Sequence, residues 1–168
     1  MGAADRAAAS AAIEMALLRR LPPGAYPIVG GYWPIQGEFD PRPYLLKSIE
    51  AGAHVALPVA RRPAGPLEFR LWTPGAPMTA GLWDIPHPAE GAIVVPSALL
   101  IPLVGFDGAG HRLGNGGGYY DRTLAALTPR PLAIGVGFEL GRLATIAPAP
   151  HDQPMDAIVT EAGVQSTK

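Results

Sequence analysis

The segment that most constrains the fold of this chain is the stretch Arg112–Arg122, with the sequence RLGNGGGYYDR. Four of the five positions at its centre are glycine, and without Cβ atoms their backbone N–H groups stay accessible to a ligand. The apolar run Ala98–Phe106 before it predicts a buried strand, and the residues from Tyr119 onward predict a helix whose positive dipole end faces the same space. With Arg112 before the loop and Asp121 after it, this strand–loop–helix unit predicts a site for phosphate groups and a divalent cation.

Composition limits the class of protein. The 168 residues, 48% hydrophobic and 16% charged, predict one globular domain, 1–168, with a full core. The chain has no cysteine, which excludes disulfides, zinc–thiolate sites and thiol nucleophiles. The net charge of -1 argues against nucleic acid or a membrane surface as partner, and no apolar run approaches the length of a membrane span. Because the N-terminus lacks the basic start and apolar core of a secretory signal, we expect a cytoplasmic protein.

Apolar spacing, punctuated by glycine and proline, predicts alternating helices and short strands. The predicted helices are 3–21, 41–51 and 119–127, and the predicted strands are 26–33, 54–59, 67–72, 92–95, 98–106, 132–138 and 157–160. The strand 67–72 has the alternation of an exposed edge, 73–90 is expected to be loop, and 141–147 a short turn. This order predicts an α/β fold with a mainly parallel sheet, in which ligands bind beyond the carboxyl ends of strands.

The glycine loop fits neither common nucleotide-binding pattern. It is not a Walker A loop because no Gly-Lys-Ser/Thr follows, and a dinucleotide fingerprint beginning at Gly114 would need glycine at Tyr119. Glu139, at the end of the next strand, keeps a nicotinamide cofactor as a minor alternative. A purely structural glycine turn is the other alternative, although the flanking charges favour phosphate.

Two carboxylates are candidates for a magnesium site, which usually uses one or two carboxylates together with substrate phosphates. Asp121 also suits the first turn of a helix, where it favours the dipole, and Asp152 would equally cap a turn. Asp156 is the next candidate. His151 beside Asp152 does not indicate a hydrolase triad, because no serine lies in a nucleophile-elbow pattern. His54 and His87 are expected to be structural or surface residues.

Three aromatic residues, Trp33, Trp83 and Tyr120, lie in predicted loops or at element ends. They would either fill the core or stack on a flat ligand. Glu38 follows a predicted strand in a loop, where a solvated acid is the default interpretation.

Four segments together resemble the 5-formyltetrahydrofolate cyclo-ligase family, also called 5,10-methenyltetrahydrofolate synthetases. They are GYWPIQGE at 31–38, WDIPHP at 83–88, IPLVGFD at 101–107 running into RLGNGGGYYDR at 112–122, and HDQPMD at 151–156 with VTE at 159–161. Their order and spacing cover the chain from about Arg6 to its end.

The resemblance implies a three-layer α/β/α sandwich with a mainly parallel sheet, similar to the sugar-phosphate isomerase and coenzyme A transferase group. It also implies an ATP- and Mg²⁺-dependent ligase that closes 5-formyltetrahydrofolate to 5,10-methenyltetrahydrofolate, releasing ADP and phosphate. The γ-phosphoryl group would be transferred to the formyl oxygen before N10 attacks the formyl carbon. Such chemistry depends on positioning and charge neutralisation, so it requires no protein nucleophile.

The same resemblance assigns roles to residues. ATP would be held by Arg112, Gly114, Asn115, Gly116, Gly117, Gly118 and Tyr119, and magnesium by Asp121 and Asp152. The folate substrate would be bound by Trp33, Glu38, Trp83 and Tyr120, with Arg112 and Tyr120 as the catalytic pair. Aromatic walls suit a flat pterin, whose amino-pyrimidine edge can donate paired hydrogen bonds to a carboxylate.

One departure from the family concerns the N-terminus. Family members usually begin with a helix carrying Lys-x-x-Leu-Arg, which reaches the ATP phosphates, and this sequence lacks that motif; its only lysines are Lys47 and Lys168. The second hypothesis is therefore a non-catalytic homologue that binds folate or nucleotide, and a nicotinamide-dependent oxidoreductase is the third. We expect a monomer or weak homodimer.

Overall fold

The computed structural model describes residues 1–114 and 117–167. The helices are α1 (Ala3–Arg20), α2 (Arg42–Glu50) and α3 (Tyr119–Ala126), with single 3₁₀ turns at Leu82–Asp84 and Glu139–Gly141. The strands are β1 (Ile28–Gly30), β2 (His54–Val59), β3 (Glu68–Trp72), β4 (Met78–Ala80), β5 (Pro86–Pro88), β6 (Ile93–Val94), β7 (Ala98–Pro102), β8 (Gly105–Phe106), β9 (Arg112–Leu113), β10 (Leu132–Val136), β11 (Ala157–Thr160) and β12 (Gly163–Ser166).

The main sheet has, among the described residues, eight strands in the order β12-β11-β10-β7-β1-β2-β3-β6. The five strands from β11 to β2 are parallel to one another, and antiparallel strands continue the sheet at both ends. Central β7 pairs with β1 and β10, and residues 98–101 are fully buried. A continuous apolar run of this kind is typical of a parallel strand covered on both faces, so the predicted fold class is confirmed.

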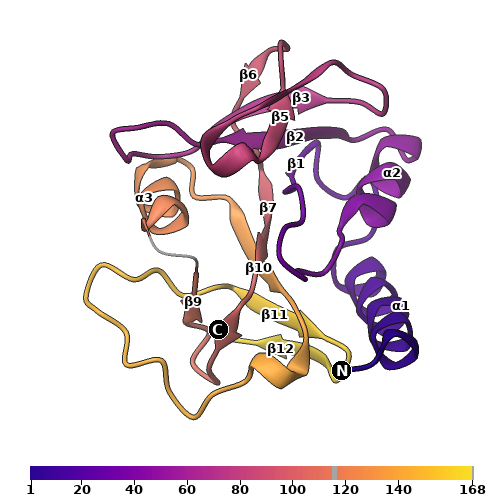
Figure 1. The fold of residues 1–168 in the computed structure, drawn as a ribbon, viewed down its shortest axis with the longest axis vertical. Coiled ribbons are helices and arrows are strands. Elements are labelled where there is room, and N and C mark those ends of the chain that lie inside the picture. The colour runs from indigo at the N-terminus through magenta and orange to yellow at the C-terminus, as the bar shows by residue number, and fades with distance from the viewer. Residues whose placement is uncertain (115–116, 168) are drawn as a thin grey trace.

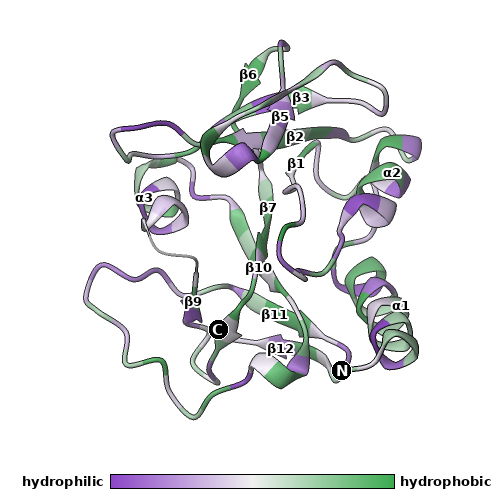
Figure 2. Cartoon of the chain, in the orientation of Figure 1, coloured by the Kyte–Doolittle hydropathy of each residue, from purple (hydrophilic) through white to green (hydrophobic). Residues whose placement is uncertain are grey.

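Helices cover both faces of the sheet. Leu17 of α1 and Leu45 of α2 pack with one set of sheet residues, whereas Leu124 of α3 and Phe106 of β8 pack with the opposite set. Figure 1 shows α1 and α2 together on one side of the strands and α3 on the other. The strands β2, β10 and β11 between them are predominantly apolar (Figure 2). No helix within the described ranges is both long and apolar enough to cross a bilayer.

Several boundaries differ from the sequence prediction. The strand predicted at 26–33 is paired only over Ile28–Gly30, and the one predicted at 98–106 ends at Pro102. Proline lacks the N–H that the ladder needs, and the chain resumes at Gly105–Phe106 in a hairpin with β9 instead of the main sheet. The segment 73–90, expected to be loop, contains the β4–β5 hairpin. The predicted edge strand at 67–72 is flanked by β6, and β12 was not predicted.

Candidate active site

A cavity of about 580 Å³ opens beyond the carboxyl ends of β1, β2 and β7, where a parallel sheet is expected to bind ligands. Its walls come from the chain after these strands, the β4–β5 hairpin, β9 and the start of α3. The lining residues are Tyr32, Trp33, Ile35, Gln36, Glu38, Pro58, Ala60, Leu67, Leu82, Trp83, Ile85, His87, Pro102, Val104, Arg112, Gly114, Tyr119 and Tyr120. All four residues predicted to bind the folate, Trp33, Glu38, Trp83 and Tyr120, therefore lie around one cavity.

Arg112 supplies a half-buried positive charge to this cavity. Its Nη1 donates to the Pro102 carbonyl at 3.2 Å, and its Cζ lies 5.0 Å from the centre of the Tyr120 ring. Its Nε is buried and has no hydrogen-bond partner among the described residues. Burial lowers the pKa of the Arg112 guanidinium, while the nearby Tyr120, Asp121, Glu38 and Asp152 oppose that shift. Because arginine stays charged in proteins, the site presents a desolvated cation with an unused donor, which favours an anionic ligand.

Glu38 stands at the end of a tight turn. The Glu38 N–H donates to the Ile35 carbonyl at 2.9 Å, and the Ile35 N–H donates back to Glu38 Oε1 at 2.9 Å. Burial raises the pKa of the Glu38 carboxyl, and the Ile35 N–H and Arg112 partly offset this. Glu38 is thus a partly desolvated carboxylate on the cavity wall and differs from the solvated loop acid that is the default interpretation.

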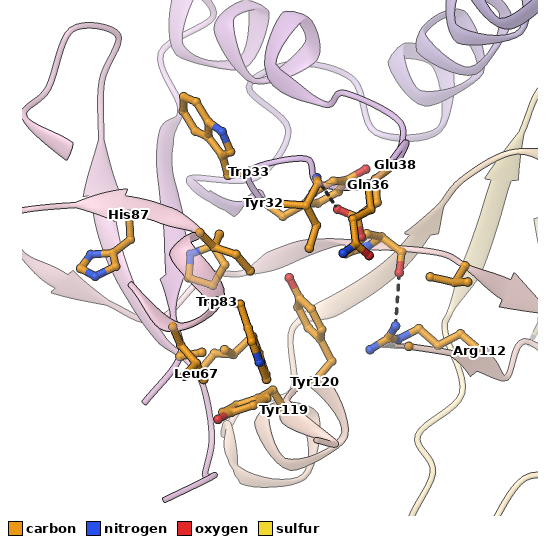
Figure 3. Close-up of a pocket in the computed structure, with 18 residues that line it drawn as sticks. Tyr32, Trp33, Gln36, Glu38, Leu67, Trp83, His87, Arg112, Tyr119 and Tyr120 are labelled. Atoms are coloured by element: carbon orange, nitrogen blue, oxygen red, sulfur yellow. Dashed lines mark hydrogen bonds between the residues drawn. The ribbon is translucent and has the colours of Figure 1, made fainter. Parts of the chain in front are cut away.

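Aromatic rings form the remaining walls. Trp83 lies edge-on to Tyr119 with ring centres 5.8 Å apart, and the Arg42 guanidinium lies 4.6 Å from the centre of the Trp33 ring. Trp83 is 55% exposed and has a φ of 55°, so a left-handed turn holds a large apolar ring in solvent. Figure 3 shows Trp83 and Tyr119 on one side of the cavity, Glu38 and Arg112 on the other, and Tyr120 between them.

The glycine loop leads into α3. Gly114 lies against Arg112, because a Cβ at that position would be 2.9 Å from Arg112 Nη1. Gly117 and Gly118 both have left-handed backbone, with φ of 83° and 65°, and Gly118 is the N-cap of α3 without any side-chain cap. The first amides of α3 are therefore available to a ligand. Asn115 and Gly116, which were also predicted to bind ATP, lie outside the described residues.

A second cavity of about 580 Å³ adjoins the start of α3 and is lined by Gly117, Gly118, Asp121, Arg122, Ala125 and His151. Asp121 Oδ1 accepts the Gln153 N–H at 3.0 Å, and Asp152 Oδ2 accepts the Ala149 N–H at 2.8 Å. The two predicted magnesium ligands thus come from neighbouring segments. Asp121 lines the second cavity, whereas Asp152 does not, and Asp152 Oδ1 lies 3.5 Å from His151 Nε2. A pair of carboxylates fits a magnesium ion that is also held by substrate phosphates.

Other metal and cofactor candidates are engaged elsewhere. Asp156, the next metal candidate, accepts Arg130 Nη1 at 2.9 Å and the Ala133 N–H at 2.7 Å through its Oδ2, so the structure gives this carboxylate a structural role. In the described part of the chain, no group of three or more His, Cys, Asp and Glu residues is placed to hold a metal ion. Glu139, the candidate for a nicotinamide ribose, instead accepts hydrogen bonds from Arg142 and Thr160.

Sequence reasoning missed some residues of the cavity. Gln36 lines it with a left-handed φ of 47°, and His87, expected to be structural or at the surface, lines it as well. His87 Nδ1 lies 2.9 Å from the Pro88 carbonyl, which makes that nitrogen the donor of the bond. Arg122, whose guanidinium donates to the Gly117 carbonyl, covers the end of the glycine loop. The sequence feature that could have indicated Gln36 as a cavity residue is its place just before Gly37 and Glu38.

Comparisons with known proteins agree on one family. The model of the 5-formyltetrahydrofolate cyclo-ligase family matches residues 8–161. The chain is 37% identical to a 5-formyltetrahydrofolate cyclo-ligase of Mycolicibacterium smegmatis over 142 residues, covering 79% of this chain and 72% of the relative. It is 33% identical to the enzyme of that name from Escherichia coli K12, covering 76% and 74%.

Solved structures show the same fold. The NMR structure of an Aquifex aeolicus 5,10-methenyltetrahydrofolate synthetase aligns with a TM-score of 0.82 at 27% identity, covering all of this chain and 86% of the other. The structure of a 5,10-methenyltetrahydrofolate synthetase from Mycoplasma pneumoniae aligns with a TM-score of 0.78 at 22% identity, covering 96% and 90%.

Proposed function

The chain belongs to the 5-formyltetrahydrofolate cyclo-ligase family, and on that premise we propose that it closes 5-formyltetrahydrofolate to 5,10-methenyltetrahydrofolate with consumption of ATP. The observation that carries the proposal is the place of Arg112. This cation lies on the wall of the aromatic cavity next to Glu38, Gly114 and Tyr120, and its pKa also responds to the charges of Asp121 and Asp152. One side chain therefore joins a site for a flat ligand to a site for phosphates.

The pterin of the folate binds between the aromatic side chains of the first cavity. Trp83 and Tyr119 meet edge to face and offer ring surfaces to a planar ligand, and Trp33 also lines this cavity. Glu38 Oε1 is occupied by the Ile35 N–H, which leaves Oε2 and the second lone pair of Oε1 for the amino-pyrimidine edge. Partial burial strengthens these bonds, because water competes less for the carboxylate.

The ATP phosphates bind at the glycine loop and the first turn of α3. Uncapped amides and the helix dipole favour negative charge at this point, and Arg112 supplies a full positive charge with an unpaired Nε. The oxygens of Asp121 and Asp152 that are free of backbone bonds would hold Mg²⁺. When bound, the ion neutralises phosphate charge and aligns the γ-phosphoryl group.

The reaction then needs two steps, a phosphoryl transfer and a ring closure. The γ-phosphoryl group moves from ATP to the formyl oxygen, releasing ADP and converting a poor leaving group into a phosphate ester. The N10 amine attacks the formyl carbon, loses its proton, and inorganic phosphate leaves to give the methenyl product. Arg112 stabilises the negative charge on the transferred group, and such a contact is typically worth several kcal/mol in the transition state. Burial raises the pKa of Tyr120, so it stays a neutral phenol that supports the Arg112 guanidinium and offers its hydroxyl to the substrate.

The test is an absorbance assay with 5-formyltetrahydrofolate, ATP and Mg²⁺ that follows the near-ultraviolet band of the methenyl product. We expect product that depends on ATP and on Mg²⁺, together with equimolar ADP. Binding of folate and ATP without product would contradict the proposal and identify a non-catalytic binding protein. Absence of folate binding would remove the assignment of the first cavity as well.

A further inference from the structure

Arg6, near the start of α1, reaches the turn that carries Glu38. Its Nη2 donates to the Gly37 carbonyl and, at 3.2 Å, to the Glu38 carbonyl. Its Cζ also lies 4.7 Å from the centre of the Phe138 ring, just beyond the end of β10. Arg6 does not line the cavity, so it contacts the back of the turn and not the ligand space.

The turn held by Arg6 is conformationally unusual. Gln36 and Gly37 both have left-handed backbone, with φ of 47° and 81°. A non-glycine residue in that region is strained, and such a turn persists only where its surroundings hold it. Two charge-assisted bonds from one guanidinium to consecutive carbonyls are a specific restraint of that kind.

No carboxylate in the described part of the chain competes with these carbonyls for the Arg6 guanidinium. None of the ion pairs formed among the described residues includes it. The other arginine in contact with this region, Arg42, is paired with Asp40 at 2.8 Å. The directed contacts of Arg6 are thus the two carbonyls and the Phe138 ring, all of which fix the turn relative to the sheet.

We propose that Arg6 is a positioning residue for the folate. By holding the Gly37 and Glu38 carbonyls, it fixes the position in the cavity from which the Glu38 carboxylate binds the pterin. This inference rests on the proposed function, because it takes Glu38 as the group that binds the amino-pyrimidine edge. Its effect belongs to folate recognition and not to ATP, since the described contacts of Arg6 involve neither the glycine loop nor the two aspartates.

The experiment compares Arg6→Ala, Arg6→Lys, Glu38→Gln and the Arg6→Ala/Glu38→Gln double variant, measuring KM for each substrate and the melting temperature. Arg19→Ala, at an exposed position of the same helix, is the matched control and leaves both KM values unchanged. We expect Arg6→Ala to raise the KM for 5-formyltetrahydrofolate about tenfold and the KM for ATP less than about twofold. Both bonds come from Arg6 Nη2, and the planar guanidinium also lies over the Phe138 ring; lysine retains the charge without that planar group, so Arg6→Lys recovers part of the loss.

The double variant distinguishes positioning from general stability. If Arg6 acts through Glu38, Arg6→Ala adds less than about twofold to the folate KM in the Glu38→Gln background. A full additional increase there, or an equal rise of both KM values in Arg6→Ala, overturns the inference.

Should Arg6→Ala not fold, Arg6→Lys and its double variant with Glu38→Gln give the same reading. If Glu38→Gln itself leaves folate binding unchanged, the proposed role of Glu38 fails; if only the Arg6 variants have no effect, the positioning role alone fails.

Discussion

At the scale of single residues, burial determines what the charged groups of this site can do. Arg112 and Glu38 lie on the same cavity wall, and desolvation acts on both by lowering the pKa of the guanidinium and raising that of the carboxyl. Among the described residues, neither group is relieved of this penalty by a direct ion pair with the other. Charges that are desolvated but only partly satisfied are typical of binding sites, because a ligand then completes their interactions.

Asp121 gives a direct test of the magnesium site. Replacing it by asparagine keeps an oxygen that can accept the Gln153 N–H but removes the negative charge. We expect Asp121→Asn to keep its melting temperature and to bind ATP equally with and without Mg²⁺, as measured by calorimetry. Asp5→Asn, at an exposed position of α1, retains the magnesium dependence. Unchanged affinity for the magnesium–ATP complex in Asp121→Asn would exclude Asp121 as a ligand.

We expect the Glu38 carboxylate to favour folate binding at a cost in the stability of the fold. Its folded pKa is raised above the usual 4.5, so the folded state binds more protons than the unfolded state between those two values. Stability therefore falls as pH rises through that window, and the cost is fully present above the folded pKa. Glutamine still accepts the Ile35 N–H but carries no charge, so Glu38→Gln should melt higher than the parent at pH 7 and lose that advantage towards pH 4. Folate binding should weaken in the same variant. The measurement is the melting temperature of Glu38→Gln minus that of the parent, and a difference that is no larger at pH 7 than at pH 4 contradicts this prediction.

At the scale of elements, α3 connects the glycine loop to the sheet. Thr123 Oγ1 accepts the buried Leu67 N–H at 2.8 Å and donates to the Tyr119 carbonyl at 2.7 Å, while Leu124 packs into the core on the same face. The helix has only eight residues, too few to be stable alone, so these contacts hold it and the loop before it. The position of the proposed phosphate site thus depends on packing at the far side of the helix.

Thr123→Val tests this anchoring. Valine is nearly isosteric but leaves the Leu67 N–H buried without an acceptor, which should lower the free energy of unfolding by about 1–3 kcal/mol. Thr123→Ser retains the hydroxyl and serves as control. Urea unfolding measures both variants, and a free energy of unfolding in Thr123→Val equal to that of the parent would show that the hydrogen bond to the Leu67 N–H does not anchor the helix.

At the scale of the whole molecule, the five parallel strands gather distant segments at one edge of the sheet. The Glu38 turn follows β1, and Arg112 lies in the β8–β9 hairpin that follows β7; the segment of Asp152 is joined to α3 by the bond from the Gln153 N–H to Asp121. Each covering layer packs on the sheet through its own buried cluster. The rigid part of the protein is therefore the sheet, and the loops above it carry the site.

Ligands that bind these loops should stabilise the whole fold. At about one hundred times its dissociation constant, a ligand adds about 2.7 kcal/mol, roughly 5–10 °C in melting temperature for a domain of this size. We expect 5-formyltetrahydrofolate and magnesium–ATP each to produce such a shift, Glu38→Gln to lose only the first and Asp121→Asn only the second. Loss of both shifts in either variant would show that the two cavities do not bind separate ligands.

Much of this arrangement followed from the sequence. The apolar run of β7, the glycine loop and the amphipathic helices predicted the α/β class, since local periodicity and glycine conformational freedom are encoded residue by residue. The four family segments also indicated several residues, among them Glu38 and Trp83, that line the first cavity. The hairpin β4–β5 and the edge strand β12 were missed because short, partly exposed strands have weak patterns and form by pairing with a neighbour.

Local patterns were enough to predict the class of fold, the family, and residue types suited to an anion and a flat ring. Only the tertiary structure decided that Arg112 keeps a buried, unpaired Nε, that Glu38 is partly desolvated, that Asp156 belongs to an ion pair with Arg130, and that Arg6 reaches the Glu38 turn. The physical reason is that burial and hydrogen-bond partners depend on residues distant in the chain. Arg6 and Glu38 are separated by 32 positions and meet only once α1 has packed on the sheet.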